Sequence, residues 1–489
     1  MKKFTVISLF GLLIIAFSAV SFAQEKLDFK ASGFIDEVTE YWRNVSGGNS
    51  SAGIYDTMNS AIKPGGAAFN SEAAYIESRT RLKFDMVYGK EVSGTLYFEA
   101  DGIWGNADGT RNSFGYWSAD RAAVEIKYVS IDWSPAFMPV PTTMRVGLQG
   151  FNFRPYMLIA TDGMGLDTTF KIDPVMIEPF WYKAAEGTNW VSDDTDIYGL
   201  HANAKISTIT VGGYGLTYNM RGYPYSSMTP SASYSANMWW FGVYADGKLG
   251  PLNLNADVIY DNGKVEDMLV PTNEKVKYSG AIGRLKLAFP WEKFVFGAMG
   301  LYATGADKEG TSASGLPGTA TSTGVASTKV KSWVGPPASE SAAWGGSETV
   351  GVFYSSMINR GNTGISNTDN YGALHNGGYG GTWFVKPYIS IMPVDYMKFT
   401  LQGLYIGDTT KHGDTVGTSR AADGVTLKDE KTIGWEGDLI GEFQILKQLK
   451  YTIGAGMLAP GKALSFWNGA SNTKPKTPWI VTSMFVFNF

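Results

Sequence analysis

Cysteine is absent from the sequence, and this absence narrows the chemistry that the chain can carry. It excludes disulfide bonds, a Cys-x-x-Cys-His haem attachment and a cysteine zinc site. Beyond residue 23, no run approaches the ~18 apolar residues of a transmembrane helix. The formal charge of −4 is small and there is no basic run, so nucleic acid is not an expected partner. We expect no cofactor.

Histidine is also scarce, which limits the enzymatic alternatives. The chain contains only His201, His375 and His412. His201 paired with a serine, as in an outer-membrane lipase, is the enzymatic alternative. No nucleophile elbow and no His-Glu-x-x-His motif accompanies it. We therefore expect that the protein is not an enzyme.

One acidic group is a candidate metal site. Asp193, Asp194 and Asp196 could supply oxygen ligands to a divalent cation. A solvated turn is the commoner explanation of such a cluster, so both interpretations stay open at this point.

The N-terminal segment, residues 1–23, has the pattern of a secretory signal peptide. Lys2 and Lys3 precede an apolar core, and a small-x-small site ends at Ala23. Cleavage would leave Gln24 as the first residue. The alternative is an N-terminal anchor helix, but the apolar core is short for that role. We expect export from the cytoplasm.

The hairpin Tyr75–Trp104 is the clearest unit of the mature chain. Side chains alternate faces along a strand, so each arm has one apolar and one polar face. The polar face of its first arm carries Glu77, Arg79, Arg81, Lys83 and Asp85. Each arm also has about the 9–11 residues that a tilted strand needs to cross a bilayer.

Similar segments recur along the chain, and we predict about 18 strands. They are Leu27–Trp42, the two arms of Tyr75–Trp104, Arg121–Trp133, Thr142–Phe153, Asp167–Ile172, Val175–Lys183, Asp196–Ile206, Ile209–Met220, Asn237–Leu249, Leu252–Tyr260, Ser279–Phe289, Lys293–Tyr302, Trp383–Ile391, Tyr396–Ile406, Thr432–Ile445, Leu449–Leu458 and Pro478–Phe489. The number would be 16 if a pair such as Asp167–Lys183 folded inward.

The connections alternate in length. Those after even-numbered strands have roughly two to eight residues, and those after odd-numbered strands run from about a dozen to nearly eighty, as in outer-membrane barrels. The aromatic content of 14% suits interfacial girdles. We predict an all-β, transmembrane antiparallel β-barrel with short periplasmic turns and long extracellular loops, as a single domain over residues 24–489 in the Gram-negative outer membrane.

The last strand provides a second, independent indication. Its apolar face ends with Phe485, Phe487 and Phe489, and the chain stops on an aromatic residue. This ending is similar to the signal that the barrel assembly machinery reads, so that machinery and outer-membrane lipid are expected partners.

Several segments resemble the alginate-export-type family of outer-membrane barrels. The stretches are Ser78-Arg79-Thr80-Arg81-Leu82, Asp193-Asp194-Thr195-Asp196-Ile197-Tyr198-Gly199, Gly434-Trp435-Glu436-Gly437-Asp438 and Gly456-Met457-Leu458-Ala459-Pro460-Gly461. The resemblance is spread over most of the mature chain. It implies an 18-stranded barrel that conducts a charged polysaccharide.

The strand alternation also predicts which charges point into the barrel. A charged side chain facing lipid would cost about 2–4 kcal/mol for Arg or Lys at the midplane. The predicted pore-lining basic residues are Arg79, Arg81, Lys83, Arg145, Lys205, Arg284, Lys286 and Lys398. The predicted acidic ones are Glu77, Asp85, Glu99, Asp101, Glu125, Asp257, Glu436, Asp438 and Glu442.

These charges allow two interpretations. In one, a basic wall of Arg79, Arg81, Arg284 and Lys286 attracts anions and faces an acidic wall of Glu99, Asp101 and Glu436. In the other, cross-strand ion pairs fill and stiffen the wall. The long region 303–381 is the candidate constriction or plug, with Glu348–Met357 as a segment of strand character that could lie inside. An exposed loop is the alternative.

Two functions remain. The first is a channel for diffusion of small hydrophilic solutes, with anions and saccharides as candidates. The second is a barrel sleeve around a partner such as a multihaem cytochrome, which would have to supply every haem. The outward faces also leave room for a homotrimer interface.

Overall fold

The alternating segments form one long antiparallel sheet in the computed structural model of the chain. The structure describes residues 27–44, 72–105, 113–116, 119–154, 157–187, 192–223, 234–267, 275–306, 329–337, 351–354, 379–411 and 419–489. The expected signal peptide and its cleavage site lie outside these residues. Within the described part, no helix is both long and apolar enough to cross a membrane.

Eighteen strands make up the wall of a closed barrel. They are β1 (Leu27–Arg43), β2 (Glu72–Tyr88), β3 (Val92–Trp104), β6 (Glu125–Trp133), β7 (Thr142–Phe153), β8 (Ile159–Ile172), β9 (Val175–Ala185), β10 (Thr195–Ile206), β11 (Ile209–Tyr223), β12 (Tyr234–Leu249), β13 (Leu252–Asp267), β15 (Ala281–Trp291), β16 (Phe294–Ala303), β18 (Thr382–Val394), β19 (Met397–Asp408), β20 (Thr432–Leu446), β21 (Leu449–Pro460) and β24 (Trp479–Asn488). Each pairs antiparallel with its neighbours in this order, and β1 pairs with β24 to close the sheet. The predicted number of 18 is confirmed.

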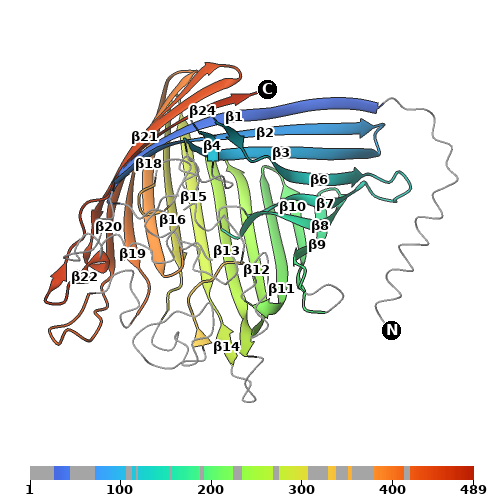
Figure 1. Cartoon of the computed structure of the whole chain (residues 1–489). Helices are drawn as coiled ribbons and strands as arrows, with labels where there is room; N and C mark the ends of the chain where they lie inside the picture. Colours follow the sequence, from blue (N-terminus) through green and yellow to red (C-terminus); the bar gives the residue numbers. More distant parts are fainter. Residues whose placement is uncertain are drawn as a thin grey trace.

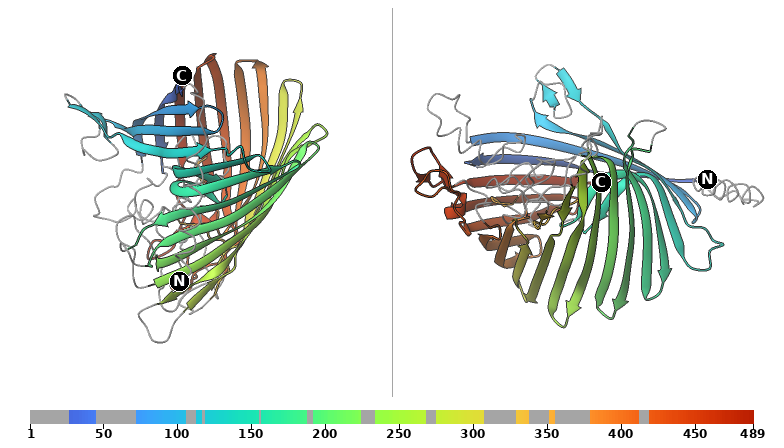
Figure 2. Two further views of the ribbon diagram at one scale, coloured as in Figure 1. Left: turned by 90° about the vertical axis from the view of Figure 1, so that its right-hand side faces the viewer. Right: turned by 90° about the horizontal axis from the view of Figure 1, so that it is seen from below.

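Short elements occupy the connections. They are β4 (Ser113–Tyr116), β5 (Ala119–Ala122), β14 (Lys275–Tyr278), β17 (Lys329–Val330), β22 (Phe466–Trp467), β23 (Asn472–Thr473) and the 3₁₀ turn η2 (Lys462–Leu464). In Figure 1, β1, β2 and β3 cross the upper part of the view at a steep angle to β10–β16. Figure 2 shows the strands following one another around the wall.

The connections alternate as predicted, so the barrel has a short-turn end and a long-loop end. Counted along the wall from β1, every second strand is followed by a short turn, such as residues 173–174 after β8, 207–208 after β10 and 250–251 after β12. One expectation was wrong: the β7–β8 connection is only residues 154–158, because β8 begins at Ile159 rather than at Asp167. Gly163 and Gly165 lie on the inner face of this first half, so no polar side chain there alternates with the exposed Met164, and the sequence pattern does not mark a strand.

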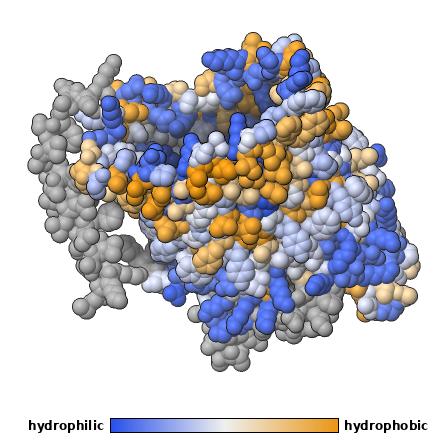
Figure 3. Space-filling model, turned by 180° about the vertical axis from the view of Figure 1, so that it is seen from behind, coloured by the Kyte–Doolittle hydropathy of each residue, from blue (hydrophilic) through white to orange (hydrophobic). Residues whose placement is uncertain are grey.

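The two faces of the sheet differ in polarity. On β12, Trp239, Phe241 and Val243 are 42%, 47% and 61% exposed, whereas the alternate residues Met238 and Trp240 are fully buried. On the side of the molecule seen in Figure 3, apolar residues gather in a band across the middle, with hydrophilic residues above and below it. The outer face therefore has the character that lipid requires, and the alternate residues form the inner face.

Glycines on the inner face make room for large rings. A Cβ on Gly199 of β10 would lie 2.0 Å from the ring of Phe180 on β9. Tyr214 covers Gly242 in the same manner, since a Cβ there would lie 2.2 Å from its ring. Part of the inner face is therefore a packed aromatic core.

Candidate functional site

The inner face of β2 and β3 carries a ladder of ion pairs. Arg79 Nη2 lies 2.6 Å from Asp101 Oδ2, and the Arg81 guanidinium pairs with Glu99. The hairpin register sets these pairs, because Arg79 is opposite Asp101 and Arg81 is opposite Glu99. We call these four residues the β2–β3 ladder.

The ladder corrects the expectation of two opposing walls. The arginines and the two acids that were assigned to opposite sides belong to adjacent strands of one hairpin, and they neutralise each other. The interpretation as cross-strand ion pairs fits this part of the sheet. Residues at equal distances before and after the turn at residues 89–91 face each other in the hairpin. This rule pairs Arg79 with Asp101 and Arg81 with Glu99, so these ion pairs can be predicted from the sequence.

Lys127 on β6 extends the ladder and was missed. Its Nζ lies 2.6 Å from Asp162 Oδ2 on β8 and 3.8 Å from Glu99 Oε2. Lys127 lies where the β3–β6 register shifts between Tyr97 and Phe98, which interrupts simple alternation. The sequence did contain one indication: Lys127 is two residues from Glu125, so simple alternation places it on the same inner face as Glu125.

Further ion pairs lie on the inner face toward the short-turn end. Lys83 Nζ is 2.9 Å from Asp85, and Arg145 Nε is 2.6 Å from Asp132. Glu442 binds two lysines, with distances of 2.8 Å to Lys398 and 2.6 Å to Lys450. The strand registers place the other predicted inward charges on the same face: Glu77, Glu125, Lys205, Asp257, Arg284, Lys286, Glu436 and Asp438.

The short β7–β8 connection enters the barrel. Arg154, directly after β7, has a left-handed φ of 47° and reaches β12 and β13. Its guanidinium lies 2.6 Å from Asp246, pairs with Asp257, and stacks 4.2 Å from the centre of the Tyr244 ring. The side chain therefore ties this connection to a distant part of the wall.

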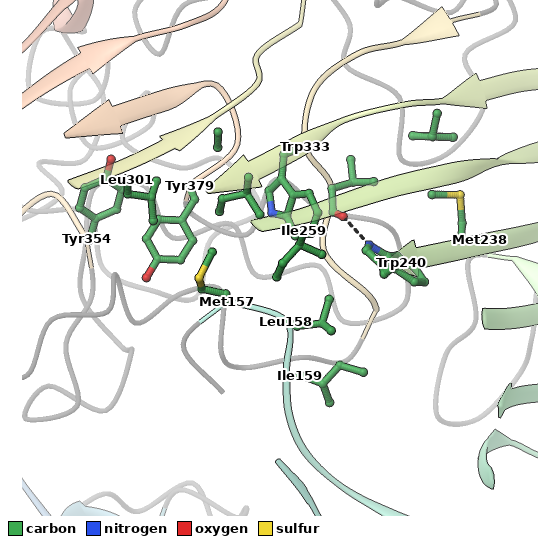
Figure 4. Close-up of a cluster of buried hydrophobic side chains, with 14 of the residues drawn as sticks. Met157, Leu158, Ile159, Met238, Trp240, Ile259, Leu301, Trp333, Tyr354 and Tyr379 are labelled. Atoms are coloured by element: carbon green, nitrogen blue, oxygen red, sulfur yellow. Dashed lines mark hydrogen bonds between the residues drawn. The ribbon is translucent and has the colours of Figure 1, made fainter. Parts of the chain in front are cut away.

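Apolar residues that come shortly after Arg154 in the chain are also buried inside the barrel. Met157, Leu158 and Ile159 are buried within the core that includes Trp240 and Trp333 (Figure 4). Arg154, Met157 and Leu158, the described residues of the β7–β8 connection, thus fill space inside the barrel, although the sequence indicates a constriction in region 303–381 alone.

Two buried carboxylates bind backbone of the long β16–β18 connection. Asp261 of β13 accepts from the Val334 N–H of this connection at 3.1 Å, and also from the Gly280 N–H, between β14 and β15, at 2.8 Å. Glu436 of β20 accepts from Val352 at 2.9 Å and Phe353 at 2.8 Å. Residues 351–354 form bends rather than the expected strand, and the rest of Glu348–Met357 lies outside the described residues.

Basic and acidic groups meet on the inner face between β15 and β20. Asp438 accepts from Gln402 Nε2 at 2.7 Å, and buried Lys386 lies on β18. Arg284 donates to Asn255 at 2.7 Å, and Lys286 Nζ lies 5.9 Å from the centre of the Tyr388 ring.

Neither the lipase-like pair nor the metal site is assembled. His201 contacts Glu178 through Nδ1 at 2.9 Å and Tyr244 through Nε2 at 2.8 Å, not a serine. Asp194 pairs with Lys183, and Asp196 accepts from an indole N–H. Within the described ranges, no group of three His, Cys, Asp or Glu side chains could hold a metal ion.

At the long-loop end of the barrel, hydrogen bonds join the β19–β20 connection to the β21–β24 connection. The Arg420 N–H donates to Asn472 Oδ1, and Asn472 Nδ2 donates back to the Arg420 carbonyl, both at 2.8 Å. Bonds from Thr426, both its hydroxyl and its N–H, and from the Val425 N–H hold the pKa of Asp423 below its usual value.

Solved structures share this architecture. A BenF-like porin from Pseudomonas fluorescens Pf-5 aligns with a TM-score of 0.51 at 10% identity, covering 94% of this chain and 98% of that one. Acinetobacter baumannii OccAB3 aligns at 0.50 and 9%, covering 94% and 100%. Pseudomonas aeruginosa OccK8 (OprE) aligns at 0.50 and 9%, covering 94% and 98%. No protein-family model and no curated protein sequence matches the chain. The chain therefore has the fold of outer-membrane porins.

Proposed function

We propose that the chain is an outer-membrane porin through which small hydrophilic solutes diffuse, with anions and saccharides as candidate cargo. The observation that supports this most directly is the closed barrel with an apolar outer face and charged residues on its inner face. A channel needs no bond-making groups, because its selectivity follows from the field and width of its lumen. Its location is the outer membrane of a Gram-negative cell.

The solute route runs along the polar part of the inner face. The ladder residues Arg79 and Asp101 keep about a quarter of their side-chain surface exposed, at 25% and 26%. Inward residues of the other side, such as Tyr218, Trp240 and Phe384, are fully buried. The charges assigned from the sequence as pore-lining are proposed to line this route.

The channel is narrowed from inside by its own connections. Described parts of region 303–381, residues 329–337 and 351–354, are largely buried against the wall. The β7–β8 connection adds a second inward segment through Arg154. We assign the constriction to these three segments together.

This filling favours a channel over a sleeve. A partner such as a multihaem cytochrome would need most of the lumen, whereas aromatic side chains and the inward segments already occupy one side of it. The alginate-export-type resemblance remains a proposal about cargo. The paired charges of the β2–β3 ladder support small solutes better than a long polyanion.

Three further assignments belong to the same proposal. Residues 1–23 direct export and are cleaved after Ala23. The exposed rings of Phe485 and Phe487 on β24, and of Phe489 directly after it, present the ending that the assembly machinery recognises. The aromatic outer band can also support a homotrimer.

Liposome swelling tests the proposal. Vesicles that contain the refolded protein should swell in isotonic solutions of monosaccharides and more slowly as the saccharide grows. The purified protein should be colourless and active without a partner. Swelling no faster than in empty vesicles, or co-purification with a haem protein, would reject the channel in favour of the sleeve.

A further inference from the structure

The position of residues 351–354 inside the barrel depends on one wall carboxylate. Val352 and Phe353 are both fully buried, and their adjacent N–H groups point to different oxygens of Glu436. The Val352 N–H donates to Oε1 and the Phe353 N–H donates to Oε2. Glu436 itself is only 4% exposed.

A carboxylate suits this geometry better than any neutral side chain. Two donors approach two different oxygens, and both oxygens of an ionised carboxylate accept. A glutamine offers one carbonyl oxygen and would turn its NH₂ group toward the second N–H, leaving two donors face to face. Buried Lys386 on β18 supplies a positive charge to this region, and Glu436 shares it with Asp438 on the same face of β20.

The other described inward segment is held more redundantly. Residues 329–337 are bound through Asp261, through Trp240 Nε1 to the Val334 carbonyl at 2.9 Å, and through the Trp333 N–H to Thr304 at 2.9 Å. For residues 351–354, the described wall contacts besides Glu436 both come from Tyr354, whose hydroxyl donates to Thr382 Oγ1 at 2.7 Å and whose ring lies 5.2 Å from that of Phe384. Loss of Glu436 should therefore displace residues 351–354 more than loss of Asp261 would displace residues 329–337.

We propose that Glu436 is a positioning residue that holds residues 351–354 against the wall and thereby sets the width of the channel. This inference rests on the proposed porin function for its consequence, but the anchoring itself can be measured without any current. Releasing the segment exposes Val352 and Phe353 and changes the bore that solutes meet.

Thiol labelling tests whether Glu436 holds residues 351–354 against the wall. Because the chain has no native cysteine, only the introduced thiol reacts. Val352→Cys is introduced alone and together with Glu436→Gln, and labelling by a water-soluble maleimide is timed in folded protein. Losing one charge-assisted hydrogen bond should make labelling about tenfold faster. Glu442→Gln is the matched control, since it removes the same charge from the same face of β20 without touching residues 351–354. It should leave the labelling rate unchanged.

Conductance tests the consequence. In planar bilayers, Glu436→Gln should conduct more per opening than the unsubstituted protein, with heat-modifiable electrophoretic mobility verifying the folded barrel. Equal labelling and equal conductance would overturn the proposal. A barrel that never conducts, yet shows faster labelling, would reject the porin function and keep the anchor. Should Glu436→Gln fail to fold, Val352→Pro removes one donor without altering the wall; an unchanged conductance there would also overturn the proposal.

Discussion

Arg154 offers the sharpest test of how the inner space is organised. Its guanidinium joins the β7–β8 connection to Asp246 and Asp257, which lie on strands far from β7 in the barrel order. Arg154→Met keeps much of the side-chain volume and removes the charge. The change leaves both acids without this partner.

The two acids should contribute very differently to the cost. Asp257 is 2% exposed and keeps Arg284 as its cross-strand neighbour on β15, so removing the Arg154 guanidinium leaves a buried, less compensated charge and should cost up to about 3–5 kcal/mol. Asp246 is 34% exposed, and a pair with that much access to water is worth about 0–1 kcal/mol. Stacking on Tyr244 adds about 0.5–2 kcal/mol. Asp257 therefore dominates.

Urea unfolding of the refolded protein in lipid vesicles, followed by tryptophan fluorescence, measures these terms. Arg154→Met should lower the free energy of unfolding by several kcal/mol. Adding Asp257→Asn should restore most of the loss, because the buried charge that has lost Arg154 is then gone, whereas adding Asp246→Asn should restore about 1 kcal/mol at most. A loss below about 1 kcal/mol, or better rescue by Asp246→Asn, would refute this account of a buried tie.

Three other predictions concern the wall. Arg81→Glu changes the local charge by two units beside an acidic neighbour, so the reversal potential in a KCl gradient should move toward cation selectivity; an unmoved potential would contradict the assigned route. Gly199→Ala places a Cβ 2.0 Å from the ring of Phe180 and should cost about 1–3 kcal/mol in urea unfolding. Gly437→Ala has open space and should be near neutral, and equal losses in the two variants would refute the steric argument. Deleting Phe489 should lower the yield of folded barrel in the outer membrane, measured by heat-modifiable mobility, and an unaltered yield would count against its role in assembly.

Strand positions were the most predictable part of the fold. Period-two alternation placed Thr142–Phe153 at its observed bounds, because Met144, Val146 and Leu148 mark the outer face and alternate with Arg145 and Gln149 on the inner face. The alternation failed for the first half of β8, where Gly163 and Gly165 occupy the inner face and leave it without polar side chains. It also missed the shift in register beside Lys127. Local pattern thus predicts a strand only where each face has side chains to mark it.

Contacts across the lumen could not be predicted in this way. Arg154 and Asp246 are 92 residues apart, and Val352 and Glu436 are 84 apart, with no local signature joining either pair. The ladder differs, since Arg79 and Asp101 belong to one hairpin and follow from its turn. A connection folds inward where the wall offers buried groups that can bind it. The positions of those groups depend on the closure of the whole barrel, which a local sequence pattern does not specify.

Single-channel recording of the refolded, detergent-purified protein in planar bilayers tests the central claim most directly. A porin with an inner constriction should give stable, stepwise openings without any added partner, and its reversal potential in a KCl gradient should report the sign of the solute route. A correctly folded barrel that stays closed to ions at every applied voltage would contradict the proposed channel.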